Sequence, residues 1–340
     1  MNSAKPKELS VPTIGRDFIE TLRSPWFRAV AKCQHVIQQA THQFAESRGL
    51  QHVNLPVTTG SISSPMGLGS DSLPVSIDLM GEKTYLADSM QFALEFGCRL
   101  SQCGTYYIMP SFRGEAPDKT HLCQFFHSEA EIIGGLDKVL LYVEDYIKYL
   151  CSQILNKLRV ELETQSGNVN HLCSVIEKEG RLPKIRFSEV RRLFKDDPAY
   201  IRRVSTFAHA LTREGELELI REFGPLVWIL EPEHLSVPFY QAYTDSSRRY
   251  ARAADLLFGP GEVVGAGERH FSAQDVCDAL ATHQVNTSDY DWYIRMREEM
   301  PLQTSGFGLG IERFLMWVFQ HDSIQDFELL PRVNGVNLVP

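Results

Sequence analysis

Apolar and polar positions alternate on either side of a short polar loop within residues 112–131. An apolar run at residues 106–109 precedes the loop, and alternating side chains resume after it. This pattern predicts two antiparallel strands joined by a hairpin loop of about eight residues. The charged side chains of the segment are expected on one face of the strand pair: Arg113, Glu115, Glu129 and Glu131.

A charged strand face is costly to bury unless it meets a charged ligand or is paired internally. Arg113 and Glu115 are two residues apart, so we expect both on the same side of the strand. Together they suit a ligand with phosphate and donor groups, as a nucleotide has. The alternative is a surface hairpin with a solvated ion-pair face, which this segment alone does not exclude.

Residues 305–313 place glycine at alternate positions and lead into the apolar run 314–318. This pattern predicts a strand whose backbone a ligand approaches closely, followed by a helix that begins near Glu312. Arg313 in the first helical turn opposes the helix dipole, and a bound polyphosphate would explain that placement. The spacing excludes a dinucleotide-binding fingerprint, because the third glycine comes two residues after the second.

These two segments resemble motifs 2 and 3 of the class II aminoacyl-tRNA synthetases, and more specifically of the asparaginyl/aspartyl branch. The resemblance implies an α+β fold with an antiparallel sheet flanked by helices. It continues in the family's order along residues 26–332. The other matching segments are the helix-and-strand motif 1 at 26–56, the amino-acid-binding segment at 85–95, the metal and substrate loop at 255–269, and the terminal segment at 324–332.

The resemblance also implies a domain organisation. Residues 26–340 are expected to form the catalytic domain, with a helical flank at about 152–222 in which 184–190 matches a family segment. Synthetases of this branch carry an anticodon-binding barrel before motif 1. Residues 1–25 are polar and too short for such a barrel, so we expect an N-terminal extension and no anticodon-binding domain.

Composition adds few constraints. A chain of 340 residues with 43% hydrophobic residues can bury a large core. The net charge of −9 gives no general attraction for a polyanion, and the basic stretch 178–203 is interpreted mainly as solvated helix faces. Seven cysteines without a Cys-x-x-Cys pair indicate reduced thiols. With neither a signal peptide nor a membrane-spanning run in the sequence, we expect a cytoplasmic protein.

The resemblance assigns the ATP site to five side chains. Arg113 is expected to contact the α-phosphate and the substrate carboxylate, while Arg313 binds the γ-phosphate end. Phe125 is expected to stack on adenine, and Glu115 to receive its amine. His121 occupies a position where the family uses basic side chains over the phosphates.

Asp255 and Glu262 resemble the family's magnesium carboxylates, with Glu262 also part of the ATP site. Mg²⁺ prefers one or two carboxylates, with phosphates and water completing the octahedron, so two acids suffice. The expected cofactors are therefore ATP and Mg²⁺. The alternative interpretation is a pair of ordinary loop acids.

The resemblance places five side chains around the amino acid: Ser89, Gln91 and Glu129 near its α-ammonium group, and Glu95 and Arg269 at its far end. Leu94 stands where aspartate-specific members have a lysine, while Glu95 matches the asparagine-specific members. A glutamate beside an arginine can bind a carboxamide, accepting from its NH₂ while the arginine donates to its oxygen. This pair favours asparagine as the substrate.

The same pair also suits aspartate bound in the reverse direction. Its α-carboxylate would then face Arg269 and its ammonium group Glu95, which leaves the β-carboxylate at ATP. The product would be a β-aspartyl adenylate, and an amine acceptor would convert it to asparagine or a related amide.

Several positions around the substrate depart from the family pattern. The motif 2 loop at 116–120 is one residue shorter than in the asparaginyl pattern, and Thr120 replaces its usual arginine. Residues 265–269 read Gly-Ala-Gly-Glu-Arg in place of Gly-Gly-Ser-Gln-Arg, and Gln-Thr at 303–304 replaces Pro-His. These departures predict retained adenylation with an altered substrate or acceptor, and tRNA as an unlikely partner.

Three functions compete at this point. The leading one is an AMP-forming ligase that makes an amide from aspartate or a close analogue with ammonia or a small amine, as in the archaeal asparagine synthetases that this chain resembles. The second is activation of asparagine or an analogue for transfer to tRNA, a carrier protein or a metabolite. The third is a non-catalytic regulatory paralogue, which the retained site residues disfavour. In each case motif 1 predicts a homodimer built on residues 26–56.

Overall fold

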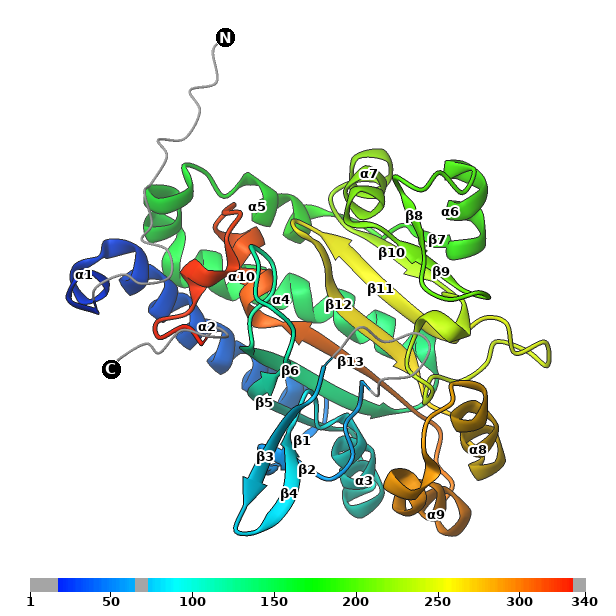
Figure 1. The fold of residues 1–340 in the computed structure, drawn as a ribbon. Helices are drawn as coiled ribbons and strands as arrows, with labels where there is room; N and C mark the ends of the chain where they lie inside the picture. Colours follow the sequence, from blue (N-terminus) through cyan, green and yellow to red (C-terminus); the bar gives the residue numbers. More distant parts are fainter. Residues whose placement is uncertain (1–17, 65–72, 333–340) are drawn as a thin grey trace.

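A single eight-stranded sheet organises the protein. The computed structural model describes residues 18–64 and 73–332, and the strand order is β1–β5–β6–β13–β12–β11–β10–β7 (Figure 1). The edge strands β1 and β7 pair in parallel with their neighbours, and the pairs between them are antiparallel. The strands are β1 (Gln51–His52), β5 (Thr105–Phe112), β6 (Gln124–Ile133), β7 (Lys184–Arg186), β10 (Val227–Leu230), β11 (Ala253–Phe258), β12 (Gly261–Glu268) and β13 (Thr304–Gly310).

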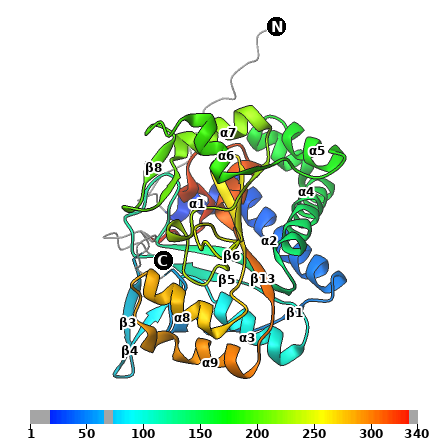
Figure 2. The same ribbon diagram turned by 90° about the vertical axis from the view of Figure 1, so that its right-hand side faces the viewer.

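Helices flank this sheet, which confirms the predicted fold class (Figure 2). Two small sheets accompany it, β2 (Thr58–Thr59) with β4 (Glu82–Leu86) and β3 (Val75–Leu79), and β8 (Ile201–Arg203) with β9 (His209–Leu211). The α-helices are α1 (Phe18–Arg23), α2 (Pro25–Ser47), α3 (Gln91–Ser101), α4 (Leu136–Ser166), α5 (Asn170–Glu177), α6 (Phe187–Phe194), α7 (Arg213–Phe223), α8 (Ala273–Thr282), α9 (Asp291–Glu299) and α10 (Ile311–Val318).

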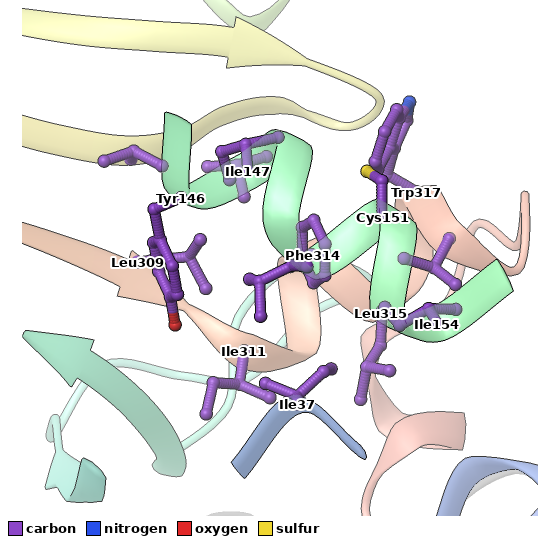
Figure 3. Close-up of a cluster of buried hydrophobic side chains, with 14 of the residues drawn as sticks. Ile37, Tyr146, Ile147, Cys151, Ile154, Leu309, Ile311, Phe314, Leu315 and Trp317 are labelled. Carbon is purple, nitrogen blue, oxygen red and sulfur yellow. The ribbon is translucent and has the colours of Figure 1, made fainter. Parts of the chain in front are cut away.

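The core lies between one face of the sheet and the layer of α2, α4 and α10. Alternate residues of β6 and β13 point into it, among them Ile132 and Phe307. Figure 3 shows Leu309 of β13 close to the buried side chains that α4 and α10 contribute. Because side chains alternate along a strand, the residues between these core positions face the opposite side of the sheet.

The two segments predicted from the sequence pattern, at residues 112–131 and 305–318, fold largely as expected. β5 and β6 are antiparallel, with Phe112 opposite Gln124, and α10 begins at Ile311 directly after β13. The connecting loop is longer than predicted and covers residues 113–123. Arg113 and Glu115 therefore lie in the loop and not on the strand face.

The flank at 152–222 is not purely helical, because β7, β8 and β9 interrupt its helices. Each of these strands has only three residues, too few for an alternating pattern to be recognised in the sequence. In the basic stretch 178–203, ion pairs join Arg181 to Asp145, Arg186 to Glu231 and Arg191 to Asp196.

Two other predictions concern the chain as a whole. All seven cysteines lie in the described part of the chain and are free thiols. Across residues 18–64 and 73–332, no helix is long and apolar enough to cross a membrane. The predicted N-terminal extension falls mostly on residues 1–17, which are outside the described residues.

Candidate active site

A cavity of about 650 Å³ opens on the sheet face opposite the α2–α4–α10 layer. It brings together all the predicted site residues except Glu95. We call the part formed by Arg113, His121, Phe125 and Arg313 the hairpin end. The part formed by Ser89, Gln91, Glu129, Gln241 and Arg269 is the inner end.

Paired strands form the floor of the cavity, and glycines leave part of this floor without side chains. Glu129 lies opposite Gly308, Gly308 opposite Gly265, and Gly265 opposite Asp255. Three strand spacings separate the two acids, or roughly 14 Å. A Cβ atom at residue 308 would lie 3.1 Å from Glu129 Oε1. The glycines therefore leave room for an elongated ligand to lie across the sheet between the acids.

Two arginines reach the hairpin end from different elements. The guanidinium carbon of Arg113 lies 5.4 Å from the centre of the Phe125 ring. Arg313, from the first turn of α10, donates from Nη1 to the carbonyl of Glu262 at 2.9 Å. Burial and the nearby charge of Arg113 lower the pKa of Arg313, against the opposite effect of Glu262. Two cations facing one cavity favour an anionic ligand.

His121 connects the hairpin loop to Arg313. Its Nε2 lies 3.1 Å from Arg313 Nη2, and its Nδ1 lies 2.9 Å from Asp118 Oδ1. Because a guanidinium only donates and a carboxylate only accepts, this geometry requires a neutral imidazole with its proton on Nδ1. His121 thus orients Arg313 in this arrangement, in addition to its predicted position over the phosphates.

Three carboxylates line the cavity beside the arginines: Asp255 of β11, Glu262 of β12 and Glu216 of α7. Burial, followed by the charges of Glu262 and Glu216, raises the pKa of Asp255 well above its usual range. Burial and Glu262 likewise raise the pKa of Glu216 to about 7. Such repulsion is relieved by a cation, so the cluster fits a divalent metal.

The predicted magnesium pair differs from its expected setting. Asp255 and Glu262 lie on adjacent strands and not in a loop, because β11 turns tightly into β12 and Phe258 pairs with Gly261. Among the described residues, no group of three or more His, Cys, Asp or Glu side chains is arranged to hold a metal by itself. The residues therefore fit the two-carboxylate arrangement in which ligand phosphates complete the coordination.

At the inner end, Glu129 is a fixed hydrogen-bond acceptor. Ser89 Oγ donates to its Oε2 at 2.6 Å, Tyr107 donates to the same oxygen, and His127 Nδ1 lies 3.1 Å from Oε1. Although burial alone would raise the pKa of Glu129, His127 and these hydrogen bonds hold it below its usual value. Gln91 Nε2 is buried nearby without a hydrogen-bond partner among the described residues. An anionic acceptor beside an unsatisfied donor suits a zwitterionic ligand.

Arg269 is enclosed by protein groups. Glu131 accepts from its Nε at 3.2 Å and from its Nη2 at 3.0 Å, and Gln241 Oε1 accepts from Nη1 at 3.2 Å. The ring of Tyr240 lies 5.3 Å from the guanidinium carbon. Burial raises the pKa of Glu131 to about 7, despite the opposing charge of Arg269. A Cβ atom at residue 306 would overlap Glu131 Oε2, so Gly306 is required for this pair.

The structure does not bring Glu95 to the cavity. Tyr293 donates to its Oε1 at 2.6 Å, and Arg297 pairs with its Oε2. Arg99 lies 4.0 Å from Oε2 on the following turn of α3. Because protein donors occupy both oxygens, Glu95 lacks the direct substrate contact expected from the sequence. Its charge acts from behind Glu131 and Arg269.

Sequence reasoning missed three cavity residues. Glu216 stands in an ordinary amphipathic helix, and Gln241 and Tyr240 follow an irregular segment, so no local pattern distinguishes them. The glycine at 261 is no signal for Glu216, because its positive φ calls for glycine in any case. The glycine at 267, which replaces a serine of the family pattern, carried a weak signal for Gln241, since a Cβ atom there would overlap the Gln241 carboxamide.

Comparisons with known proteins give a matching family profile and several relatives. The sequence profile of the tRNA synthetases class II (D, K and N) matches residues 14–334. The chain is 27% identical to an asparagine–tRNA ligase of Bacillus cereus over 336 residues, which is 92% of this chain and 72% of that protein. It is 26% identical to asparagine–tRNA ligase of Thermococcus gammatolerans over 320 residues, which is 92% of this chain and 70% of that protein.

Solved structures share the fold. Asparaginyl-tRNA synthetase from Pyrococcus horikoshii complexed with asparaginyl-adenylate superimposes with a TM-score of 0.84 at 22% identity, covering 94% of this chain and 71% of that one. Aspartyl tRNA synthetase from Entamoeba histolytica gives a TM-score of 0.72 at 16% identity, covering 94% and 61%.

These relatives contradict one prediction made from the sequence and change which of the candidate functions is favoured. The prediction that tRNA is an unlikely partner is wrong, because the similar proteins are themselves tRNA ligases. The shorter motif 2 loop and Thr120 therefore do not argue against tRNA. The amide-forming interpretation receives no support from the curated relatives, which favour the alternative of asparagine activation.

Proposed function

Because this chain belongs to the tRNA synthetases class II (D, K and N), a family of ATP-dependent, AMP-forming ligases, we propose that it activates asparagine as asparaginyl-adenylate and transfers it to tRNA. The observation that carries this proposal is one cavity with two arginines at its hairpin end and an amino-acid-sized set of polar groups at its inner end. The names of its relatives support the choice of amino acid and acceptor.

The hairpin end fits ATP. Arg113 Nε is buried and has no hydrogen-bond partner among the described residues, so it is available to a phosphate oxygen. Phe125 lines the cavity and offers an aromatic ring on which the planar base could stack, with the guanidinium carbon of Arg113 5.4 Å from the centre of that ring. Arg313 would bind the terminal phosphates. Mg²⁺ held by Asp255 and Glu262 would neutralise charge on the phosphates.

The chemistry that the residues support is attack of a carboxylate oxygen on the α-phosphorus of ATP, which forms the adenylate and releases pyrophosphate as the bond to the β-phosphate breaks. Arg113 would neutralise the negative charge of both reacting groups and hold them together. Glu129, with Ser89 and Gln91, would bind the α-ammonium group and thereby point the carboxylate towards Arg113. The bare glycine floor between Glu129 and Asp255 would let the ligand extend from the inner end towards the phosphates, which would bring the reacting atoms together.

The electrostatics of the inner end favour asparagine over aspartate. Glu131 compensates the charge of Arg269 through two hydrogen bonds, so no full positive charge remains for a second carboxylate. Glu95 adds further negative charge behind this pair. A neutral carboxamide is therefore cheaper to place there than a carboxylate.

The test is ATP–pyrophosphate exchange with a panel of asparagine, aspartate, glutamine and glutamate, followed by product analysis with total tRNA or with ammonia. We expect asparagine to support pyrophosphate exchange best, and radiolabelled asparagine to become attached to tRNA. Exchange that depends on aspartate, with release of asparagine in ammonia, would overturn the proposal in favour of amide formation. Absence of exchange with every amino acid would indicate a non-catalytic protein.

A further inference from the structure

Gln241 is held in the cavity wall by its backbone. It forms an antiparallel bridge with Arg269, and Ala242 N donates to the carbonyl of Glu268 at 2.7 Å. His234 Nε2 donates to the carbonyl of Gln241 at 2.7 Å, and His283 Nε2 donates to His234 Nδ1 at 3.0 Å. These contacts lie outside the cavity and hold the backbone of Gln241 in place, so they fix the position of its Cα atom.

The direction of the Gln241 carboxamide is determined by chemistry. Its Oε1 accepts from Arg269 Nη1, and a guanidinium has no acceptor, so the reverse orientation is ruled out. The side chain lines the cavity, and its Nε2 has no hydrogen-bond partner in the described part of the chain. The amide therefore offers two N–H donors and one further lone pair of Oε1.

Gly267 makes room for this carboxamide. A Cβ atom at residue 267 would overlap Gln241 Oε1 and crowd the rest of the amide. The backbone at 267 has no positive φ that would otherwise call for glycine. The absence of a side chain at 267 is thus explained by the position of Gln241.

We infer that Gln241 is the residue that selects a carboxamide over a carboxylate in the side chain of the activated amino acid. The inference rests on the proposed function. Gln241 Nε2 donates to the carbonyl of the substrate amide, and Oε1 accepts from its NH₂, while Arg269 is fixed by Glu131 from the other side. Aspartate has no donor for Oε1, and its carboxylate would face that lone pair.

The experiment compares wild type with Gln241→Met, which keeps the length of the side chain and removes both polar atoms. Pyrophosphate exchange is measured with asparagine and with aspartate at varied ATP. We expect kcat/KM for asparagine to fall about ten- to hundredfold, mostly through KM, as fits the loss of two hydrogen bonds. The preference for asparagine over aspartate should shrink, while KM for ATP stays within about twofold. Gln274→Met, on the exposed face of α8, is the matched control.

A second variant, at Gly267, tests whether the position of the Gln241 carboxamide matters. Gly267→Ala should displace the carboxamide and reproduce the loss of Gln241→Met, and adding it to Gln241→Met should cost less than about threefold more. ATP binding measured by calorimetry shows that each variant is folded at the site. If Gln241→Met keeps the wild-type ranking, or weakens ATP equally, the inference is overturned and the proposed function stands. If wild type itself shows no exchange with asparagine, the proposed function fails and the inference fails with it.

Discussion

The two ends of the cavity relate to the sequence in different ways. At the hairpin end, every side chain predicted to contact ATP lines the cavity, including Arg113 and Arg313. At the inner end, the predicted pair of Glu95 and Arg269 is separated. Glu95 is bound to Arg297 and Tyr293, and Gln241 lies beside Arg269 in its place.

The difference follows from how each end is built. The hairpin end is made by consecutive residues of one strand–loop–strand unit and one strand–helix junction, so local spacing determines which side chains meet. The inner end is made by α3, β6, β12 and an irregular segment near residue 241, which lie far apart in the chain. There, several charged groups compete for the same partners, and only their packed positions decide the pairing.

The largest effect is expected at the hairpin end. Arg113→Ala should reduce asparagine-dependent exchange by about a thousandfold or more, because the charge it neutralises develops in the transition state. Thermal unfolding should change little, since Arg113 Nε has no hydrogen-bond partner among the described residues. Arg221→Ala, at an exposed pair on α7, is the control. A loss below about tenfold would remove Arg113 from its proposed role.

At the inner end, Glu95→Gln should act on stability first. Breaking a fully buried ion pair leaves Arg297 without its counter-charge and should lower the free energy of unfolding by about 3 kcal/mol, as measured with urea. Glu161→Gln, whose exposed pair with Lys32 should contribute less than about 1 kcal/mol, is the control. We also expect asparagine to remain first in the ranking of amino acids, with a smaller margin over aspartate because the Glu95 charge behind Glu131 and Arg269 is removed. A changed ranking would make Glu95 a substrate contact and remove the contrast between the two ends.

The histidines behind Gln241 should make the inner end sensitive to acid. Burial lowers the pKa of His234 to about 4 and those of His270 and His283 to about 3. The unfolded chain binds protons on these groups below about pH 6.5, whereas the folded protein does not. The free energy of unfolding should therefore fall between pH 7 and pH 5 by about 1–2 kcal/mol for each histidine.

Urea unfolding of His283→Gln at both pH values checks this prediction. Glutamine can still donate to His234, so the variant should fold, and its loss of stability on acidification should be smaller by about 1–2 kcal/mol. His35→Gln, on the exposed side of α2, is the control. If wild type and His283→Gln lose the same free energy of unfolding between pH 7 and pH 5, the prediction that His234 and His283 are neutral in the folded protein is wrong.

The smallest effect is expected at the helix that carries Glu216. Thr212 Oγ1 accepts from Gly215 N at 3.1 Å and caps α7. Thr212→Ala should cost about 1 kcal/mol in the free energy of unfolding, while Thr212→Ser should retain the cap. Equal stability of the two variants would show that this cap does not hold the carboxylate end of the cavity in place.

Local patterns in the sequence were enough to predict several strands and the start of one helix. Alternation around residues 112–131 predicted β5 and β6, and the glycines at 306, 308 and 310 predicted β13 and the start of α10. These predictions succeed because backbone preferences and side-chain period act over a few neighbouring residues. Motif order then identified the α+β fold and the hairpin end.

Only the tertiary structure decided which charges pair. Residues 95 and 297, or 131 and 269, are brought together by the sheet and the helices beside it, and each pair excludes other partners by burial. The same packing placed Glu216 beside Asp255 and Gln241 above Gly267. No local pattern encodes such contacts, because a buried charge binds whichever counter-charge the fold leaves nearest, and that distance is set by the whole chain.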